Sequence, residues 1–481
     1  MANFTSSAGD LPPLPPFTLT PQPSLISYLP DSHLSYISPI IAYWIISLLF
    51  HLIDVFDLFP QYRLHTPAEV LKRNHVSRYE VFKDVIIQQV IQSVVGWMLA
   101  MFEAEPMTGK QDHDIAAWAR KIRLAQRLVP ILLGLAGLDA IAMAKRMHWI
   151  FPTLSGALAG GQYPWLTQTI VTDGIASVAP AFASWELLVA KAIYWLAVPA
   201  FQFTFAVVWL DTWQYFLHRF MHMNKWMYTT FHSRHHRLYV PYAYGALYNH
   251  PFEGFLLDTL GAGTGYLASG MSPRQGIWFF TCSTIKTVDD HCGYALPWDP
   301  LQHLTSNNAG YHDIHHQSWG IKTNFSQPFF TFWDRILGTR WAGGDVSTRY
   351  ERAATAAQKQ LDVDQQNKAN ITSPPPIPAR FPVTPTIASP LTGMPLLPSA
   401  PPGKASAQAN ASRQQVLDSL DHDGSAVLAQ ESAEEQREMA QQERKKGSSS
   451  QTATPLKGLR EKIDGSLHGR GGGVLGVDSG H

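Results

Sequence analysis

Apolar runs without charged residues recur along the first 300 residues and are separated by short polar segments. Leu34–Ile53 and Ala192–Leu210 contain no Asp, Glu, Lys or Arg, and each is about long enough to cross the hydrocarbon core of a bilayer. Val85–Phe102 is also uncharged, and Leu128–Ala144 is interrupted by a single charge, Asp139. These four runs predict membrane helices.

Two further apolar runs, Thr259–Pro273 and Gln275–Ile285, are too short to span a membrane separately. They predict a broken or re-entrant hairpin packed against the other helices. A soluble helical core is the alternative for the shorter runs, because apolar stretches of about 10–14 residues often indicate only that. We expect an all-α, integral membrane helical bundle, with N-terminal membrane helices and their connections in residues 34–191.

The two ends of the chain lack this pattern. Residues 1–33 are rich in proline and predict a loose N-terminus. Beyond the body, only Tyr350 and Phe381 of the 56 aromatic residues occur in residues 350–481. A segment with so few large apolar groups cannot bury enough surface to offset its ordering entropy. We therefore expect a disordered polar tail over 350–481, with one transient helix around Gln430–Lys446.

Composition narrows the function classes. Charged residues make up 15% of the chain, which is low for a soluble domain, and the formal net charge is zero. A nucleic-acid-binding protein would show a basic excess, so no nucleic-acid partner is expected. The two cysteines, Cys282 and Cys292, exclude a disulfide scaffold and a cysteine-rich zinc fold.

Histidine is the most informative residue type. Eleven of the 20 histidines lie between His218 and His316, and eight of these eleven form three boxes with the patterns HxxxH, HxxHH and HxxHH. The boxes consist of His218 and His222, then His232, His235 and His236, and finally His312, His315 and His316.

Helix geometry gives this spacing a chemical meaning. Residues at i, i+3 and i+4 lie on one side of a helix, so each box offers two or three imidazoles to one small volume. Imidazole binds Fe, Zn and Cu, and a single metal ion seldom takes more than about four protein ligands. Eight clustered imidazoles therefore predict two metal ions. The alternative, a metal-sequestering histidine tract, would be of low complexity, whereas these boxes lie in aromatic, patterned sequence.

The first box directly follows the apolar run Ala192–Leu210, so it is expected where a membrane helix emerges into water. Arg219, Lys225, Arg234 and Arg237 gather nearby, and an excess of positive charge indicates the cytosolic side. A metal site at the membrane surface above an apolar bundle suits a substrate with a long hydrocarbon chain.

The three boxes resemble those of the membrane-bound fatty acid hydroxylase superfamily, over roughly Ala192 to Thr339. Within it, the surrounding sequence is most similar to the fungal sphingolipid C4-hydroxylases. This closer resemblance rests on four segments: 211-DTWQYFLHRFMH-222, 249-NHPFEG-254, 289-DDHCGY-294 and 332-FWDRILG-338.

The resemblance implies a catalytic domain over residues 192–341 that holds two non-haem iron ions. The eight box histidines are the implied iron ligands, and His250 and His291 are added as ligands or as residues that orient ligands. Four aspartates are candidates for orienting imidazoles, although each could equally cap a helix or pair with an arginine: Asp211, Asp289, Asp290 and Asp313. His303 fits no box and is expected to be structural.

The implied activity is O2-dependent hydroxylation at C4 of a sphingoid base or ceramide, in a multi-pass protein of the endoplasmic reticulum membrane. Electrons would come from NADH through cytochrome b5 and its reductase. His250-Pro251 is followed by Phe-Glu-Gly rather than the Gly-Gly of a cytochrome b5 haem loop, so a separate electron donor is expected, with Arg234 and Arg237 as candidate contacts for it or for lipid headgroups. The alternatives are a sterol C4-methyl oxidase or C5-desaturase of the same superfamily, and a non-catalytic membrane metal-binding protein.

Overall fold

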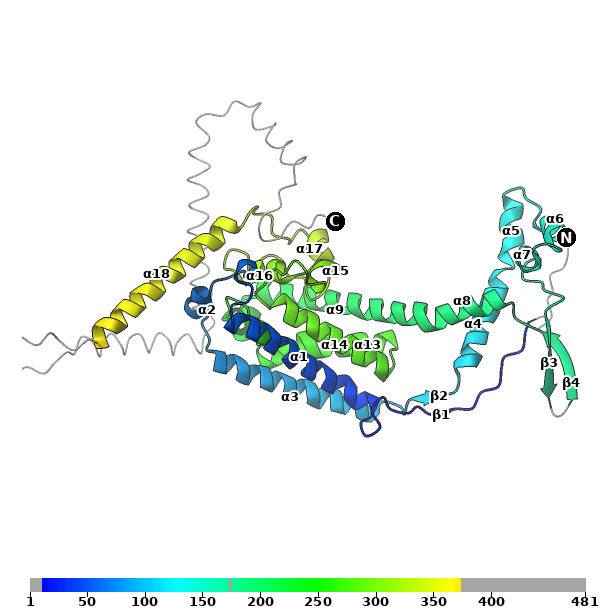
Figure 1. Cartoon of the computed structure of the whole chain (residues 1–481), viewed down its shortest axis with the longest axis horizontal. Helices are drawn as coiled ribbons and strands as arrows, with labels where there is room; N and C mark the ends of the chain where they lie inside the picture. The colour runs from blue at the N-terminus through cyan, green and yellow to red at the C-terminus, as the bar shows by residue number, and fades with distance from the viewer. Residues whose placement is uncertain (1–10, 173–174, 373–481) are drawn as a thin grey trace, which may run out of the picture. The chain divides into compact units, whose positions relative to one another are not determined.

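The computed structural model describes residues 11–172 and 175–372, and these residues are mostly helical (Figure 1). The long helices are α1 (Asp31–Val55), α3 (Arg78–Phe102), α4 (Gln111–Ala125), α9 (Val198–Met223), α14 (Pro273–Asp290) and α18 (Ser347–Thr372). The shorter α-helices are α2 (Pro67–Arg73), α5 (Leu128–Leu135), α6 (Ala140–Met147), α7 (Pro152–Leu158), α8 (Ser184–Ala192), α10 (Lys225–Met227), α11 (Ser233–His236), α12 (Pro251–Gly254), α13 (Leu260–Ser269), α15 (Leu301–Leu304), α16 (Ala309–His316) and α17 (Phe332–Ile336).

Other elements interrupt or connect these helices. There are π-helical turns η3 (Ile193–Ala197), η4 (Tyr228–His232) and η6 (Phe255–Thr259), and 3-10 turns η2 (Pro60–Tyr62) and η5 (Ala243–Gly245). The chain divides into two compact units, each described separately below. The first comprises Met1–Pro39, Ser93–Leu210 and Ala262–Thr281, and the second comprises Ile40–Gln92, Asp211–Gly261 and Cys282–His481.

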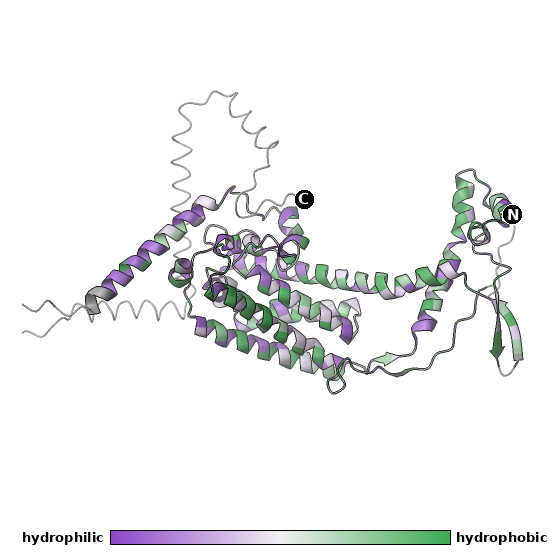
Figure 2. Ribbon diagram, viewed as in Figure 1, coloured by the Kyte–Doolittle hydropathy of each residue, from purple (hydrophilic) through white to green (hydrophobic). Residues whose placement is uncertain are grey.

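Three stretches are long and apolar enough to cross a membrane: Asp31–Val55, Arg78–Phe102 and the continuous helix Ser184–Met223. Only about a fifth of each stretch is buried within the protein, so most of its apolar surface is left for lipid. Figure 2 shows apolar residues along α1, α3 and α9. The membrane helices predicted over Leu34–Ile53, Val85–Phe102 and Ala192–Leu210 are therefore confirmed as candidate spans.

The fourth predicted span, Leu128–Ala144, is not one straight helix. The helical stretch Gln111–Leu135 and α6 meet at an angle of 113°. Two local features cause the break. Gly137 takes a positive φ of 77°, and the Asp139 carboxylate accepts a hydrogen bond from the backbone N–H of Ala142, at 2.9 Å, as the N-cap of α6. The single charge in the apolar run thus starts a new helix.

The short runs after residue 259 form two consecutive helices, α13 and α14, as the hairpin prediction required. Gly270, between them, has a φ of 65°, which few side chains tolerate. On either side of this turn the rings of Tyr266 and Phe280 lie 5.3 Å apart. The second helix extends beyond the predicted Ile285 to Asp290, directly before His291.

The structure also contains strands, which the all-α prediction missed. Strands β3 (Thr167–Thr172) and β4 (Ile175–Pro180) pair antiparallel, with Thr167 opposite Pro180. The segment is rich in β-branched residues, which favour strands. In the Pro-rich N-terminus, β1 (Thr20–Pro21) pairs with β2 (Met107–Thr108), so this part of the predicted loose segment is tied down.

The predicted disordered tail begins instead with an ordered helix. α18 runs from Ser347 to Thr372 and is strongly polar (Figures 1 and 2). It packs against α2, and Lys72 of α2 forms an ion pair with Asp364. The scarcity of apolar side chains predicted disorder here, but packing against α2 orders this segment. The rest of the predicted tail, including Phe381 and Gln430–Lys446, lies outside the described residues.

The second unit holds an apolar core that supports the histidine boxes. Tyr43 of α1, Val81 and Val85 of α3 and Val288 of α14 are fully buried in one cluster. The loop that follows the second box contributes Leu238 and Tyr248, among others, to the same cluster. This packing attaches the metal-binding segments to the ends of the apolar helices.

The first unit is held by a buried ion pair between α4 and α8. The Arg123 guanidinium donates to the Glu186 carboxylate, with an Nε–Oε1 distance of 2.6 Å, and Glu186 is fully buried. Gln126 donates to the same carboxylate at 2.6 Å and accepts from the Tyr163 hydroxyl at 2.7 Å. The Arg123 guanidinium also lies over the Tyr163 ring, at 4.5 Å.

Removing one partner of this pair leaves a buried charge uncompensated. We expect Glu186→Ala to lower the free energy of unfolding by about 3 kcal/mol or more. Equilibrium unfolding in mixed detergent micelles measures this change. Glu105→Ala, which removes an exposed carboxylate from the same unit, serves as the control and should leave the stability unchanged. An equal effect of the two substitutions would contradict the role assigned to the ion pair.

Candidate metal centre

The structure gathers nine histidines into two groups, each able to hold one metal ion. Each histidine of a group offers one ligand atom, and within a group these atoms all lie within 4.8 Å of one another. The first group consists of His218, His222, His232, His236 and His315. The second consists of His235, His291, His312 and His316.

The spacing predicts that each box offers its imidazoles to one small volume. In the structure, two of the three boxes divide their histidines between the two groups. In both HxxHH boxes the residues at i and i+4 share a group, while the residue at i+3 belongs to the other. His235 thus leaves its box for the second group, and His315 leaves its box for the first. Successive helical residues turn by about 100°, so neighbours at i+3 and i+4 diverge and reach different sites. Because two boxes each supply histidines to both groups, the two sites are structurally connected.

Hydrogen bonds donated by Nδ1 fix most of these rings. Because a backbone carbonyl can only accept, each Nδ1 that lies against one carries the proton. This leaves Nε2 of the neutral ring with a free lone pair, which is the arrangement found in metal-binding histidines. Five rings donate in this way at 2.7–3.0 Å: His218 to Phe325, His235 to Tyr248, His291 to Thr287, His315 to Thr323 and His316 to Leu238.

The Nε2 atoms of each group face one another at hydrogen-bond distance. Nε2 of His218 lies 3.1 Å from Nε2 of His232, and His232 Nδ1 contacts the Glu253 carboxylate. In the second group, Nε2 of His312 lies 3.0 Å from Nε2 of His291. Where both rings carry their proton on Nδ1, the two bare Nε2 atoms repel each other at this distance unless a cation lies between them. The donor set therefore fits two metal ions bound through imidazole nitrogen.

Burial keeps these imidazoles neutral. It lowers the pKa of His232 to about 3 and that of His291 to about 3. It also lowers the pKa of His235, to about 4, although the nearby Glu253 carboxylate partly opposes the shift. The rings are thus uncharged at neutral pH and can bind metal through Nε2 without first releasing a proton.

Two other histidines lie apart from both groups. His250, predicted as a ligand or an orienting residue, is the N-cap of α12, where its Nδ1 accepts a hydrogen bond from the Phe252 N–H at 3.2 Å. The Pro251 that follows it starts the helix, so the ring is used for capping. His303 is exposed and lies 3.0 Å from the Pro297 carbonyl, as expected for a structural residue.

Of the four aspartates proposed as imidazole partners, Asp313 contacts the ring of His65, which lies outside the boxes, and the other three have different contacts. Asp211 accepts from the N–H groups of Phe329 and Phe330, and Asp290 pairs with the buried Lys286. The carboxylate that contacts a box histidine is Glu253, on α12. It was visible in the 249-NHPFEG-254 segment, but sequence spacing gives no reason to pair it with His232, 21 residues away.

A pocket opens onto both groups. Its wall includes five of the grouped histidines, from the first group His218 and His232, and from the second His235, His291 and His312. The remaining wall is largely polar, with Gln214, Asn249, Glu253, Thr287, Asp258, Asp290 and Gln327 beside Ala246, Leu257 and Pro328. A molecule in this pocket would lie within reach of both candidate metal sites.

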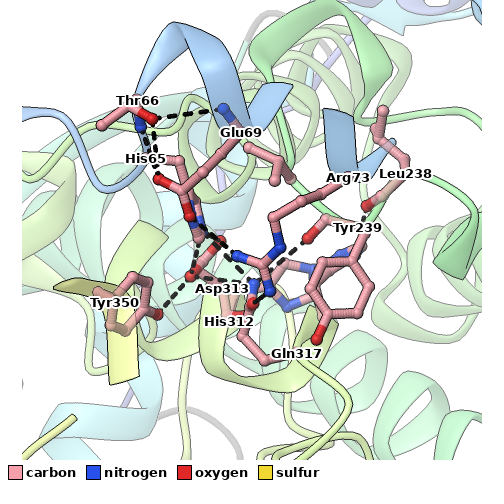
Figure 3. A network of polar contacts seen from close by, with 12 residues as sticks. His65, Thr66, Glu69, Arg73, Leu238, Tyr239, His312, Asp313, Gln317 and Tyr350 are labelled. Atoms are coloured by element: carbon pink, nitrogen blue, oxygen red, sulfur yellow. Dashed lines mark hydrogen bonds and ion pairs between the residues drawn. The ribbon is translucent and has the colours of Figure 1, made fainter. Parts of the chain in front are cut away.

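A polar network supports the third box from behind (Figure 3). His65 bridges Glu69 of α2 and Asp313 of α16, with 3.0 Å to each carboxylate. Asp313 lies between His312 and His315 in the chain, and it also accepts from the Tyr350 hydroxyl of α18. Arg73 and Gln317 complete the network. His65 could not be predicted as part of the site, because it lies far from the boxes along the chain.

Two of the basic residues near the boxes have partners inside the protein. Arg234 forms an ion pair with Asp84, at 2.6 Å. Arg237 donates to the His75 carbonyl at 3.1 Å. Both contacts reduce the freedom of these side chains to receive an acidic partner or lipid headgroups.

Comparisons with known proteins agree with this geometry. The Fatty acid hydroxylase family matches residues 203–339. The chain is 45% identical to a sphingolipid C4-hydroxylase of Schizosaccharomyces pombe over 67% of its length and 92% of the relative's. For a sphingolipid C4-hydroxylase of Saccharomyces cerevisiae the identity is 42%, over 71% of this chain and 81% of the relative. For a sphinganine C4-monooxygenase of Arabidopsis thaliana it is 40%, over 64% and 87%.

No solved structure matches the chain significantly. The protein belongs to the fatty acid hydroxylase family, within a group of relatives named as sphingolipid C4-hydroxylases. The family consists of metal-dependent oxygenases, and its membership is consistent with the apolar spans and the clustered histidines.

The His65 network predicts a pH-dependent contribution to stability. Burial alone would lower the pKa of His65, but the Asp313 and Glu69 carboxylates raise it to about 9. Burial would likewise raise the pKa of Glu69, but His65, with smaller contributions from Thr66 and Arg73, lowers it to about 2. The contribution from His65 is therefore complete below its ordinary pKa of 6.5 and is lost as the pH rises through about 9.

We expect His65→Gln to lower the unfolding temperature most near pH 6 and progressively less toward pH 9.5. Thermal unfolding in detergent, followed by tryptophan fluorescence at several pH values, measures the difference from the unmodified protein. His303→Gln, at an exposed position, should follow the unmodified protein throughout. A difference for His65→Gln that is constant with pH would show that His65 is not held in its charged form.

Proposed function

We propose that this protein is a membrane-bound di-iron monooxygenase that hydroxylates C4 of a sphingoid base. In this reaction a dihydrosphingosine-type lipid becomes a phytosphingosine-type lipid, with O2 as co-substrate. The observation that carries the proposal is the pocket whose wall contains histidines from both groups, in a chain that covers 81–92% of two named sphingolipid C4-hydroxylases.

The histidines of this chain would hold the two irons through neutral nitrogen atoms. Nδ1 of most rings donates to a backbone carbonyl, and Nδ1 of His232 contacts Glu253. These contacts orient the Nε2 atoms before metal binds. This preorganisation avoids rearrangement during the reaction. Bound iron and O2 supply the oxidation of an unactivated C–H bond, which no side chain can perform as acid or base.

Burial of the site is the second contribution of the protein. His218, His236, His315 and His316 are at most 1% exposed. Bulk water is thereby kept from the reacting carbon, which favours hydroxylation of the bound lipid over side reactions.

The same proposal places the protein in the endoplasmic reticulum membrane, with the metal centre facing the cytosol and cytochrome b5 as electron donor. The continuous helix Ser184–Met223, about 60 Å long, is roughly twice the thickness of the hydrocarbon core. Its last turns, which bear His218 and His222, can therefore extend beyond the bilayer. Arg219 and Lys225 at this end support a cytosolic orientation.

The alternatives make different lipid products. A sterol C4-methyl oxidase or a C5-desaturase would alter sterols, and a non-catalytic metal-binding protein would alter neither lipid class. The relatives named as hydroxylases and the family match argue against the last alternative.

Lipid profiling tests the proposal directly. The protein is expressed in a strain that lacks its own sphingoid hydroxylase, and long-chain bases are quantified by mass spectrometry. We expect C4-hydroxylated bases to reappear and sterols to be unchanged. Restored hydroxylation of sterol intermediates without C4-hydroxylated bases would instead support the sterol enzyme.

Substitution of one ligand tests the metal assignment in the same strain. We expect His315→Ala, and equally His232→Ala, to abolish hydroxylation and to lower the iron content of the purified protein, which still inserts in membranes. His250→Ala, outside both groups, is the matched control and should retain most of the iron and the activity. Full activity of His315→Ala would overturn the assignment of His315 as a ligand.

A further inference from the structure

Several carboxyl groups line the pocket beside the metal centre. Glu253, Asp258 and Asp290 line it, and the lining contains no lysine or arginine. Asp290 already pairs with Lys286, and Glu253 contacts His232. Asp258 differs from both, because its contacts are made by neutral amides.

Those amides hold Asp258 in place without neutralising it. Gln214 Nε2 donates to one carboxylate oxygen at 3.1 Å, and Asn249 Nδ2 donates to the other at 3.3 Å. All three side chains line the pocket. Within residues 11–172 and 175–372, Asp258 has no cationic partner. Burial, with a smaller effect from Glu253, raises the pKa of Asp258 to about 7, as expected for a carboxyl group that lacks a countercharge.

Glu253 gives a second, independent sign that a polar ligand belongs here. Its side chain is 1% exposed and lines the same pocket. One of its oxygens contacts His232, while the other, Oε2, has no hydrogen-bond partner among the described residues. A buried oxygen without a partner is costly, and a donor on a bound molecule would satisfy it.

We propose that Asp258, held by Gln214 and Asn249, is a subsite for the protonated primary amine of the substrate. The ammonium group donates to the Asp258 carboxylate, and a neighbouring hydroxyl of the same molecule donates to Glu253 Oε2. The preferred substrate is therefore a free long-chain amino alcohol, and its N-acylated, uncharged counterpart binds less well. This inference rests on the proposed function and specifies its substrate class.

The chemistry of the substrate agrees with the position of the subsite. In a sphingoid base the amine lies on C2 and a hydroxyl on C3, so the carbons that bear these polar groups lie one and two bonds from C4. An enzyme that oxidises this carbon must bind polar groups directly beside its metals. An enzyme that oxidises the middle of a hydrocarbon chain would line that space with apolar side chains. Primary amines are protonated near neutral pH, which supplies the missing charge.

Competition binding to metal-free protein tests the subsite without relying on turnover. A radiolabelled, photoreactive sphinganine is cross-linked to the protein in detergent micelles and competed with unlabelled sphinganine or N-acetyl sphinganine. We expect sphinganine to compete at least about tenfold better, as for loss of a hydrogen bond to a charged group. N-methyl sphinganine, which adds a similar small group but keeps its charge, should compete like sphinganine.

Asp258→Asn keeps the size of the side chain and removes its charge. We expect this variant to lose the preference for sphinganine over N-acetyl sphinganine while keeping its metal content after reconstitution. Asp139→Asn removes a carboxylate that only caps α6, and asparagine caps helices equally well, so this control should bind both lipids as the unmodified protein does. In the active enzyme, the ratio of kcat/KM for the two lipids should shift in the same direction.

The outcomes separate this inference from the proposed function. An unchanged preference in Asp258→Asn, with C4 hydroxylation intact, overturns the subsite and leaves the proposed function standing. Loss of metal from Asp258→Asn with normal lipid preference would show that Asp258 only offsets the charge of the metal centre. Binding that depends on both the amine and Asp258, without any C4 hydroxylation by the unmodified protein, supports the subsite and refutes the proposed function.

Discussion

The metal centre depends on imidazole nitrogens that the fold holds about 3 Å apart. Nε2 of His218 lies 3.1 Å from Nε2 of His232, and Nε2 of His291 lies 3.0 Å from Nε2 of His312. Backbone carbonyls hold the Nδ1 side of most rings, and burial keeps the rings uncharged. The fold thus holds neutral nitrogen donors close together, and a bound cation stabilises this arrangement, so metal binding and folding are thermodynamically linked.

Irregular helix geometry at the site follows from this requirement. The π-turn η4 ends at His232, and the π-turn η6 contains Asp258. An extra residue in a helical turn changes the direction in which the following side chains point, and such turns occur often at functional sites. Together with the exchange of His235 and His315 between the groups, these turns bring residues from several short helices to two adjacent points.

Much of the site could be predicted from the sequence, because i, i+3 and i+4 spacing is a local property of a helix. The eight box histidines and His291 come together as expected, and three apolar runs form candidate spans. The assignment of each histidine to a group could not be predicted, because it depends on how α9, α11 and α16 face one another. Glu253 and His65 were missed for the same reason. His250 was assigned by its motif, while its capping role comes from the proline that follows.

The contact between Tyr350 and Asp313 makes α18 part of the surroundings of the metal centre. The family match stops at residue 339, before α18 begins. Yet Tyr350 reaches the helix that carries the third box, and Asp364 still pairs with Lys72. A chain shortened at the family boundary would leave Asp313 with one fewer donor and expose the back of α16. The smallest piece that can be expected to behave like the whole enzyme therefore extends to at least residue 364.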